Sequence, residues 1–358
     1  MKVQAKSTTD RLLSGDSRAL ARAISLVENH SPGWIDLLKE LFPHTGKAMT
    51  IGLTGSPGAG KSTLVDQLAK HYRKAENPRF SKNAKSGAPA PEKDPRTTKT
   101  GLEPALSQRS QSKDEAPPEG HTIGIIAVDP TSPFTGGAIL GDRIRMQQHF
   151  SDSGIYIRSM ATRGSLGGLA GTTADVGLVL DAAGRDIIMI ETVGVGQAEI
   201  DIVRVADVTI VILVPGMGDD VQTIKAGIME IADIFVINKS DHEGAERVEK
   251  EIRALQSLAT RSDGWVPPIV KTVATEGKGT AELAEAIREY EEYLRSRNLL
   301  VRRRAEHWQL RLVEMLRDSL LHKARSVIAE GDLAGLAAEI AEHKRDPYSV
   351  IEEIQGRM

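Results

Sequence analysis

The chain has 358 residues, a formal net charge of −3 and no cysteine. This length exceeds the usual size of one domain, so we expect a main domain with appendages. The small net charge argues against nucleic acid or an anionic membrane as a partner. The lack of cysteine excludes disulfides and thiolate metal sites. No apolar run reaches membrane-spanning length and the N-terminus lacks the apolar core of a signal peptide, so we expect a cytoplasmic protein.

Residues 1–46 predict an N-terminal helical extension. Between residues 16 and 28, apolar residues at 20, 23, 24 and 27 fall on one face of a helix. Asp16 or Ser17 is the expected N-cap because both side chains accept hydrogen bonds from a helix's first amides.

A phosphate-binding loop follows the first predicted strand, Met49–Thr54, and precedes an amphipathic helix. Its sequence fits G-x-x-x-x-G-K-[ST], whose backbone amides surround nucleotide phosphates. Lys61 is placed for the β- and γ-phosphates and the Ser62 hydroxyl for Mg²⁺. The residues assigned to nucleotide binding here are Gly55, Ser56, Pro57, Gly58, Ala59, Gly60, Lys61, Ser62 and Thr63. The strand–loop–helix context predicts that the chain binds a nucleoside triphosphate.

Residues 77–118 interrupt the α/β pattern. They contain seven of the sixteen prolines and a single aromatic residue, Phe80. A segment of this composition buries too little apolar surface to offset its ordering entropy, so we expect a disordered surface insertion.

Further strand-like runs alternate with helical ones through the rest of residues 47–296. They are rich in Ile and Val without clean alternation, which is typical of parallel strands buried on both faces. The predicted strands are Thr122–Val128, Ile155–Met160, Asp186–Glu191, Val208–Val214, Ile234–Ile237 and Pro268–Ala274. We therefore predict a doubly wound α/β domain with a mostly parallel sheet.

Carboxylates stand at the ends of two of these strands. Asp129 follows the second main strand, and Glu191 ends the fourth and begins a glycine-containing run with Gly194. Mg²⁺ takes one or two carboxylates, a hydroxyl, waters and phosphates as ligands. The expected metal set is Ser62, Asp129, Asp142 and Glu191. The glycine run allows backbone amides to approach a γ-phosphate and to move on hydrolysis.

The run Asn238-Lys239-Ser240-Asp241 follows the strand Ile234–Ile237. Ligands bind at this carboxyl end in an open α/β sheet. The N-K-x-D pattern resembles the guanine-specificity motif of GTP-binding proteins. Asp241 can accept hydrogen bonds from guanine N1–H and its 2-amino group, whereas adenine offers no such donor pair. We therefore expect GTP rather than ATP as the substrate.

The C-terminal residues 297–358 predict a helical arm. Apolar side chains recur at helical spacing at Trp308, Leu312, Met315, Leu316 and Leu320. The neighbouring arginines, namely Arg302, Arg303, Arg304 and Arg311, are expected to form a solvated face. Such a helix must pack on something, and the sequence leaves dimerisation and packing on the same subunit equally open.

Taken together, these motifs resemble the MeaB family, also called ArgK. The blocks that carry the resemblance are G-S-P-G-A-G-K-S-T, D-P-T-S, G-G-A-I-L-G-D-R-I-R-M, E-T-V-G-V-G-Q-A-E, V-P-G-M-G-D-D-V-Q-T-I-K and N-K-S-D. The family's members are P-loop GTPases of the SIMIBI type that chaperone the adenosylcobalamin-dependent methylmalonyl-CoA mutase. They gate cofactor loading and protect the mutase, and they are homodimers joined by a C-terminal helical arm. The resemblance implies the same activity, a mutase of this kind as partner, and a homodimer.

The resemblance also implies three switch segments and a base-contacting turn. The switches would be residues 130–145, 191–199 and 215–225, the last of which signals the nucleotide state to the mutase. Thr272, Val273 and Ala274 match a base-contacting segment that usually reads S-A. Because Val273 lacks a hydroxyl, only backbone contacts to guanine are expected there.

We expect Mg²⁺-dependent hydrolysis of GTP by in-line attack of water. Lys61 and the loop amides stabilise charge on the phosphates, and Glu191 contributes to the metal. Gln197 and Asp129 are the candidates for positioning the water, and neither is favoured.

The sequence disfavours three alternative functions. A nucleotide-dependent kinase linked to arginine/ornithine (LAO/AO) transport is disfavoured because N-K-S-D argues against ATP. A metallochaperone GTPase usually carries Cys or His clusters, and this chain has no cysteine and nine scattered histidines. A scaffold with a vestigial loop is disfavoured because Lys61, Ser62 and Asp241 are intact.

Overall fold

The computed structural model describes residues 7–75, 120–129, 152–161, 170–192, 201–216, 229–258, 261, 263–328 and 332–358. At its centre is a seven-stranded sheet in the order β3-β2-β4-β1-β5-β6-β7. All neighbouring strands pair in parallel. The strands are β1 Met49–Gly55, β2 Ile123–Asp129, β3 Ile155–Ala161, β4 Ile187–Glu191, β5 Val208–Leu213, β6 Ile234–Asn238 and β7 Ile269–Thr272. The predicted doubly wound α/β fold is confirmed.

The strands are apolar on both faces because helices cover both sides of the sheet. Successive side chains of a strand point to opposite faces. In β4, Ile187 and Met189 therefore enter one core, whereas Ile188 and Ile190 enter the other. This explains the continuous Ile/Val runs that lack a polar alternation.

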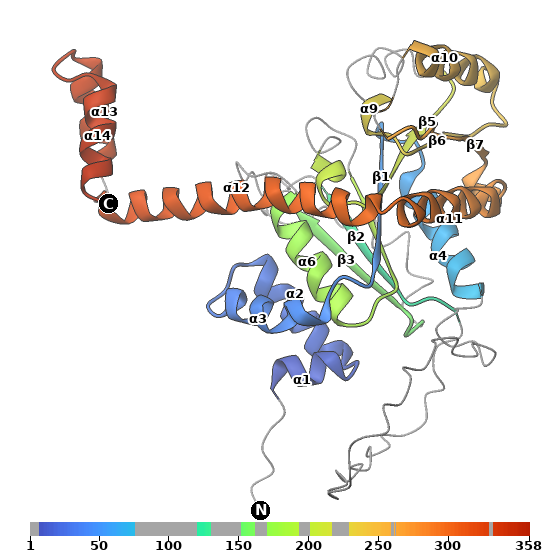
Figure 1. Cartoon of the computed structure of the whole chain (residues 1–358), viewed down its shortest axis with the longest axis horizontal. Coiled ribbons are helices and arrows are strands. Elements are labelled where there is room, and N and C mark those ends of the chain that lie inside the picture. The colour runs from blue at the N-terminus through green and yellow to red at the C-terminus, as the bar shows by residue number, and fades with distance from the viewer. Residues whose placement is uncertain are drawn as a thin grey trace, which may run out of the picture.

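Helices α4 (Lys61–Lys74) and α11 (Thr280–Ser296) pack on one face of the sheet. On the other face, α2 (Ser17–Glu28), α3 (Trp34–Leu41) and α6 (Ala170–Ala182) share a core beside β2 and β4. The remaining helical elements are α1 Thr8–Leu13, η1 Phe42–His44, η3 Ile202–Arg204, α9 Met229–Ile231, α10 Ala245–Leu258, η5 Ala274–Glu276, α12 Leu299–Val327, α13 Asp332–Ala341 and α14 Pro347–Gly356. Figure 1 shows the N-terminal helices gathered at one side of the sheet domain.

The predicted boundaries differ from the observed ones by few residues. Asp16 is the N-cap of α2, and its carboxylate accepts hydrogen bonds from the amides of Arg18 and Ala19. The last strand was predicted to continue to Ala274, but β7 ends at Thr272. Ala274 instead begins η5, because the chain turns there to reach α11.

Helix α12 leaves the domain as a long arm that ends near α13 and α14 (Figure 1). Its first part packs on the domain, and here the expected solvated arginine face is wrong. The Arg303 and Arg311 side chains are only 15% and 18% exposed, and they pair with Asp233 and Asp175. Arg304 pairs with Asp207, and only Arg302 is solvated, at 76% exposure. The physical reason is that the fold brings carboxylates from distant parts of the sequence against α12, where they form ion pairs with these arginines.

The second part of α12 carries the apolar side chains that the sequence placed on one face. Leu312, Leu316 and Leu320 are exposed in the isolated chain. The domain therefore packs only on the first part of the arm, whereas α14 of the same chain contacts α12 further out and leaves these leucines exposed. Among the described residues, no helix is both long and apolar enough to cross a membrane.

Candidate nucleotide-binding site

The phosphate loop joins β1 to α4 at the carboxyl edge of the sheet. Its conformation requires glycine at two positions. At Gly55 (φ 145°) an added Cβ would lie 2.2 Å from the carbonyl oxygen of Ile212. At Gly60, the N-cap of α4 (φ 88°), an added Cβ would lie 2.3 Å from Asn238 Nδ2. The loop therefore stays close to β5 and β6, with the N-terminus of α4 facing the same edge.

Lys61 is buried inside this loop. Its Nζ donates hydrogen bonds to the carbonyl oxygens of Gly55, at 2.6 Å, and Ser56, at 2.9 Å. The ammonium group is thus held over the loop, where phosphates bind in proteins with this motif. In the structure Lys61 therefore lies at the N-terminus of α4 with its ammonium group against the loop.

Ser62 and Glu191 lie in contact although 129 residues separate them. The Ser62 hydroxyl donates to Glu191 Oε1 at 2.6 Å, and both side chains are buried. Glu191 ends β4, with Leu53 of β1 and Ala127 of β2 as its register partners. A hydroxyl beside a carboxylate is the oxygen donor set that Mg²⁺ takes, and it has the right chemistry for that ion.

Asp129 ends β2, two positions beyond the partner of Glu191, so its backbone lies at the same edge. Its side chain is outside the described part of the structure, as are Asp142, Gly194 and Gln197. Most of the three predicted switch segments and the insertion 77–118 also lie outside it. Within the described ranges, no group of three or more His, Cys, Asp or Glu is arranged to hold a metal ion.

Asn238 connects the phosphate loop to the predicted base-contacting turn. Its Nδ2 donates to the Ala59 carbonyl oxygen at 2.7 Å. Its Oδ1 accepts from Thr272 Oγ1 at 3.0 Å and from the Ala274 amide at 3.1 Å. Thr272 belongs to the segment matched to the base-contacting turn, but the sequence assigned it no contact of its own. The signal for its contact was a polar residue at the end of the predicted strand, directly before Val273.

Asp241 lies in the turn after β6, and its side chain is 53% exposed. The turn places Lys239 in the left-handed region, with φ 54°. The Ser240 amide donates to the Thr272 carbonyl oxygen at 3.0 Å, which holds the turn against β7. Val273 and Ala274 are buried beside it. The Asp241 carboxylate faces solvent next to the buried residues Val273 and Ala274. It can therefore accept hydrogen bonds from a nucleotide base.

Comparison with known proteins is consistent with this geometry. The profile of the family described as "Methylmalonyl Co-A mutase-associated GTPase MeaB" matches residues 20–78 and 113–329. The chain belongs to this family. It is accordingly a P-loop GTP hydrolase that binds guanine nucleotides, as the sequence predicted.

Several relatives match over most of their length. A Pyrococcus abyssi protein named as a GTPase is 44% identical over 97% of this chain and 96% of its own length. GTPase ArgK of Escherichia coli is 33% identical over 77% of this chain and 73% of its own. The "Methylmalonic aciduria type A homolog, mitochondrial" of Mus musculus is 32% identical over 85% and 68%. A solved structure of a protein named "LAO/AO transport system kinase" shares the fold, with a TM-score of 0.63, 23% identity and coverage of 98% and 95%.

Proposed function

We propose that this GTPase is a chaperone of an adenosylcobalamin-dependent acyl-CoA mutase, either methylmalonyl-CoA mutase or a related enzyme. In this proposal it gates loading of the cofactor and protects the mutase from inactivation. The observation that carries the proposal is the family match, which spans both the GTPase core and the start of the arm. The similarity to the mouse homolog named for methylmalonic aciduria supports the same class of partner.

Hydrolysis would use the geometry of the carboxyl edge. Lys61 and the loop amides would hold the phosphates, and Asp241 would accept hydrogen bonds from guanine. Ser62 and Glu191 would hold Mg²⁺, which supplies positive charge at the phosphate oxygens when bound. Gln197 and Asp129 are the proposed residues for orienting the attacking water. We expect slow turnover without the partner, because a switch needs a long-lived GTP state.

We also propose that the protein is a homodimer joined through α12. The exposed leucines of its outer part, Leu312, Leu316 and Leu320, form an apolar stripe on a helix that extends from the domain. Burial of such a stripe against a second copy would remove it from water. The proposed location is the cytoplasm, where GTP is available and a chain without cysteine needs no oxidising compartment.

The decisive experiment is GTP hydrolysis by the purified protein with and without the same organism's adenosylcobalamin-dependent mutase. We expect slow hydrolysis that the mutase accelerates. Lys61→Ala should lose both phosphate affinity and turnover, whereas Lys39→Ala, a solvated lysine on α3, should behave as wild type. Hydrolysis that the mutase leaves unchanged would reject this partner, and hydrolysis retained by Lys61→Ala would reject the site.

The same preparation tests the kinase alternative, which the name of the related solved protein also raises. A kinase would transfer the terminal phosphate of ATP to a binding protein of the transport system. We expect no such transfer, because the proposed role of Asp241 is to accept hydrogen bonds from guanine, and adenine offers no matching donor pair.

A further inference from the structure

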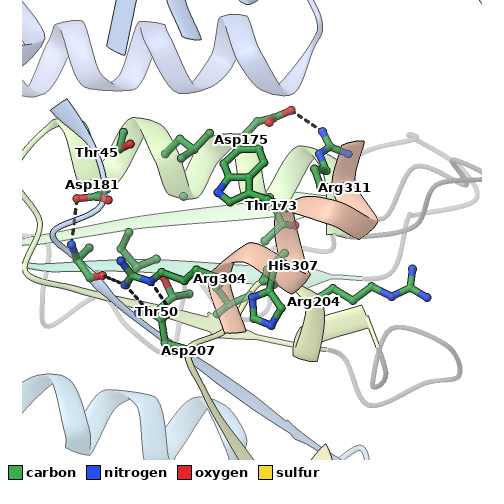
Figure 2. A pocket seen from close by; sticks show the side chains of 18 of the residues that line it. Thr45, Thr50, Thr173, Asp175, Asp181, Arg204, Asp207, Arg304, His307 and Arg311 are labelled. Atoms are coloured by element: carbon green, nitrogen blue, oxygen red, sulfur yellow. Dashed lines mark hydrogen bonds and ion pairs between the residues drawn. The ribbon is translucent and has the colours of Figure 1, made fainter. Parts of the chain in front are cut away.

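A cavity lies away from the carboxyl edge of the sheet, between α6, η3 and the first part of α12. Its volume is about 340 Å³, and its floor includes Thr50 of β1 and Ile188 of β4. None of the described residues of the phosphate loop or of the Asn238–Asp241 turn lines it. Figure 2 shows α6 on one side and the arginines and His307 of α12 on the other. A volume of this size is within the range of small-molecule sites.

The charged groups of this cavity are already paired with one another. Arg304 donates to both oxygens of Asp207, at 2.8 and 2.7 Å, and Arg311 donates to Asp175 at 3.0 Å (Figure 2). The third arginine of the lining, Arg204, donates to Glu314 at 2.9 Å.

The remaining carboxylate, Asp181, accepts hydrogen bonds from the backbone amides of Gly46, Lys47 and Ala48. Each lining charge therefore has a partner within the described structure. A charged ligand would lose its hydration on entering the cavity. It would find no oppositely charged side chain that is free to pair with it, so its binding would be unfavourable.

The polar groups of the lining that remain available are uncharged. Among the described residues, the hydroxyls of Thr50 and Thr173 and the imidazole of His307 make no side-chain hydrogen bond. Burial, assisted by the Arg303 charge, lowers the pKa of His307 to about 4, so its ring is neutral near pH 7. Each of these groups can donate or accept a hydrogen bond.

The rest of the wall is apolar and partly aromatic. Phe42 and Trp308 meet edge to face, with ring centroids 5.6 Å apart and an interplanar angle of 77°. Phe42 and Trp308 are partly exposed to solvent, and Leu178, Ile190 and Val205 also line the cavity. An apolar lining with a few convergent polar groups is typical of sites for organic molecules.

We propose that this cavity binds an uncharged, mainly apolar small molecule that carries one or two hydrogen-bonding groups. The ring or chain of the ligand lies against Phe42 and Trp308, and its polar group meets Thr50, Thr173 or His307. Because α12 forms one wall and α6 and η3 another, the bound molecule contacts the arm and the domain together. Ligand binding therefore stabilises the arm in its present position.

Gly177 of α6 offers a direct test, since it lines the cavity and an added Cβ there meets no atom within 4 Å. Gly177→Leu fills the cavity and also favours the helix. Gly335→Leu on α13 is the matched control, because an added Cβ there also meets nothing within 4 Å and the residue does not line the cavity.

The probes are two dyes that share an anilinonaphthalene skeleton. N-phenyl-1-naphthylamine is uncharged, and 8-anilinonaphthalene-1-sulfonate adds a negative sulfonate. Fluorescence titration of the full chain should show saturable binding of the uncharged dye, with affinity at least about tenfold higher than for the sulfonate. Gly177→Leu should weaken binding of the uncharged dye at least about tenfold, and Gly335→Leu should not.

Three results would overturn the proposal. They are a lack of saturable binding of the uncharged dye, equal affinity for both dyes, and wild-type binding of the uncharged dye by Gly177→Leu. The last result would place the dye elsewhere, for example on the exposed leucines of α12. Circular dichroism of each variant verifies that the fold is intact.

Discussion

The side-chain amide of Asn238 donates a hydrogen bond to the carbonyl oxygen of Ala59, with a donor–acceptor distance of 2.7 Å. This bond joins the end of β6 to the phosphate loop. The oxygen of the same side chain accepts from Thr272 and from the Ala274 amide. One buried side chain therefore positions the phosphate-binding and base-contacting segments relative to each other.

Asn238→Ala is predicted to weaken the binding of all nucleotides to a similar extent. The substitution leaves the Ala59 carbonyl and the Ala274 amide without this partner, at a cost of about 1–3 kcal/mol in unfolding free energy. Titration calorimetry should show lower affinity for GTP, GDP and xanthosine nucleotides alike. A change in base preference with unaltered affinity would contradict the bridging role.

Asp241→Asn is predicted to change base preference with little effect on stability. The side chain is 53% exposed, so the unfolding free energy should change by less than about 0.5 kcal/mol. The amide replaces one acceptor with a donor, which disfavours guanine and favours xanthine. Competition between GTP and xanthosine triphosphate measures the shift, and an unaltered preference would remove the assignment of Asp241 to the base.

Ser62→Ala is predicted to uncouple nucleotide binding from Mg²⁺. The phosphate loop keeps its amides and Lys61, so binding of GDP in the presence of a chelator should persist. The extra affinity for GTP that Mg²⁺ provides should fall, because a metal-directed hydroxyl is lost. Glu191→Gln should act in the same direction. Equal responses of wild type and both variants to Mg²⁺ would show that the ion is held elsewhere.

Arg303→Met is predicted to destabilise the fold by about 2–4 kcal/mol. Asp233 is almost fully buried and accepts two hydrogen bonds from Arg303, at 3.0 and 2.8 Å. Loss of the arginine leaves Arg261 as the remaining ion-pair partner of this carboxylate. Urea unfolding measures the change, with Arg302→Met as the matched control because Arg302 is 76% exposed. Equal stability of the two variants would mean that the arm does not pack here.

His307 is predicted to make the folded state less stable in mild acid. Burial is the main cause of its low pKa of about 4, against 6.5 in the unfolded chain; nearby Arg303 adds to it, while Asp207, Glu306 and Asp233 oppose it. The unfolded state therefore binds more protons between these values, so stability is lost as the pH falls from 6.5 to 4. Because water reaches part of the ring, we expect His307 to contribute only about 1–2 kcal/mol.

His307→Gln should flatten the unfolding free energy over this pH window. Chemical denaturation at pH 7, 5.5 and 4 measures it. An identical pH dependence in the variant and the wild type would show that His307 is solvated in the folded protein.

The fold and the outline of the nucleotide site were predictable because their signals are local. A phosphate loop is one continuous run, and a strand buried on both faces is apolar along its whole length, as β4 is. Asn238 and Asp241 were predicted on a signal of the same kind, since they directly follow a short apolar strand.

The contacts that join distant segments were not predictable in this way. Arg303 was expected in solvent, but its partner Asp233 lies 70 residues away in the sequence. Asp233 precedes β6 and also accepts a hydrogen bond from the Thr209 amide of β5. It therefore links the amino ends of these two strands to the arm. An arginine on a helix surface looks the same in the sequence whether it meets water or a carboxylate.

By itself, the sequence determined the parallel α/β core, the phosphate loop and the guanine motif, because each depends on neighbours within a short run. Only the tertiary structure decided that Asn238 bridges two loops, that the arm is fastened by buried ion pairs, and that a cavity lies beneath it. These features depend on which strands become adjacent, and strand order is set by packing of the whole chain. The sequence shows which residues are charged, but the tertiary structure determines whether each charge is buried and paired.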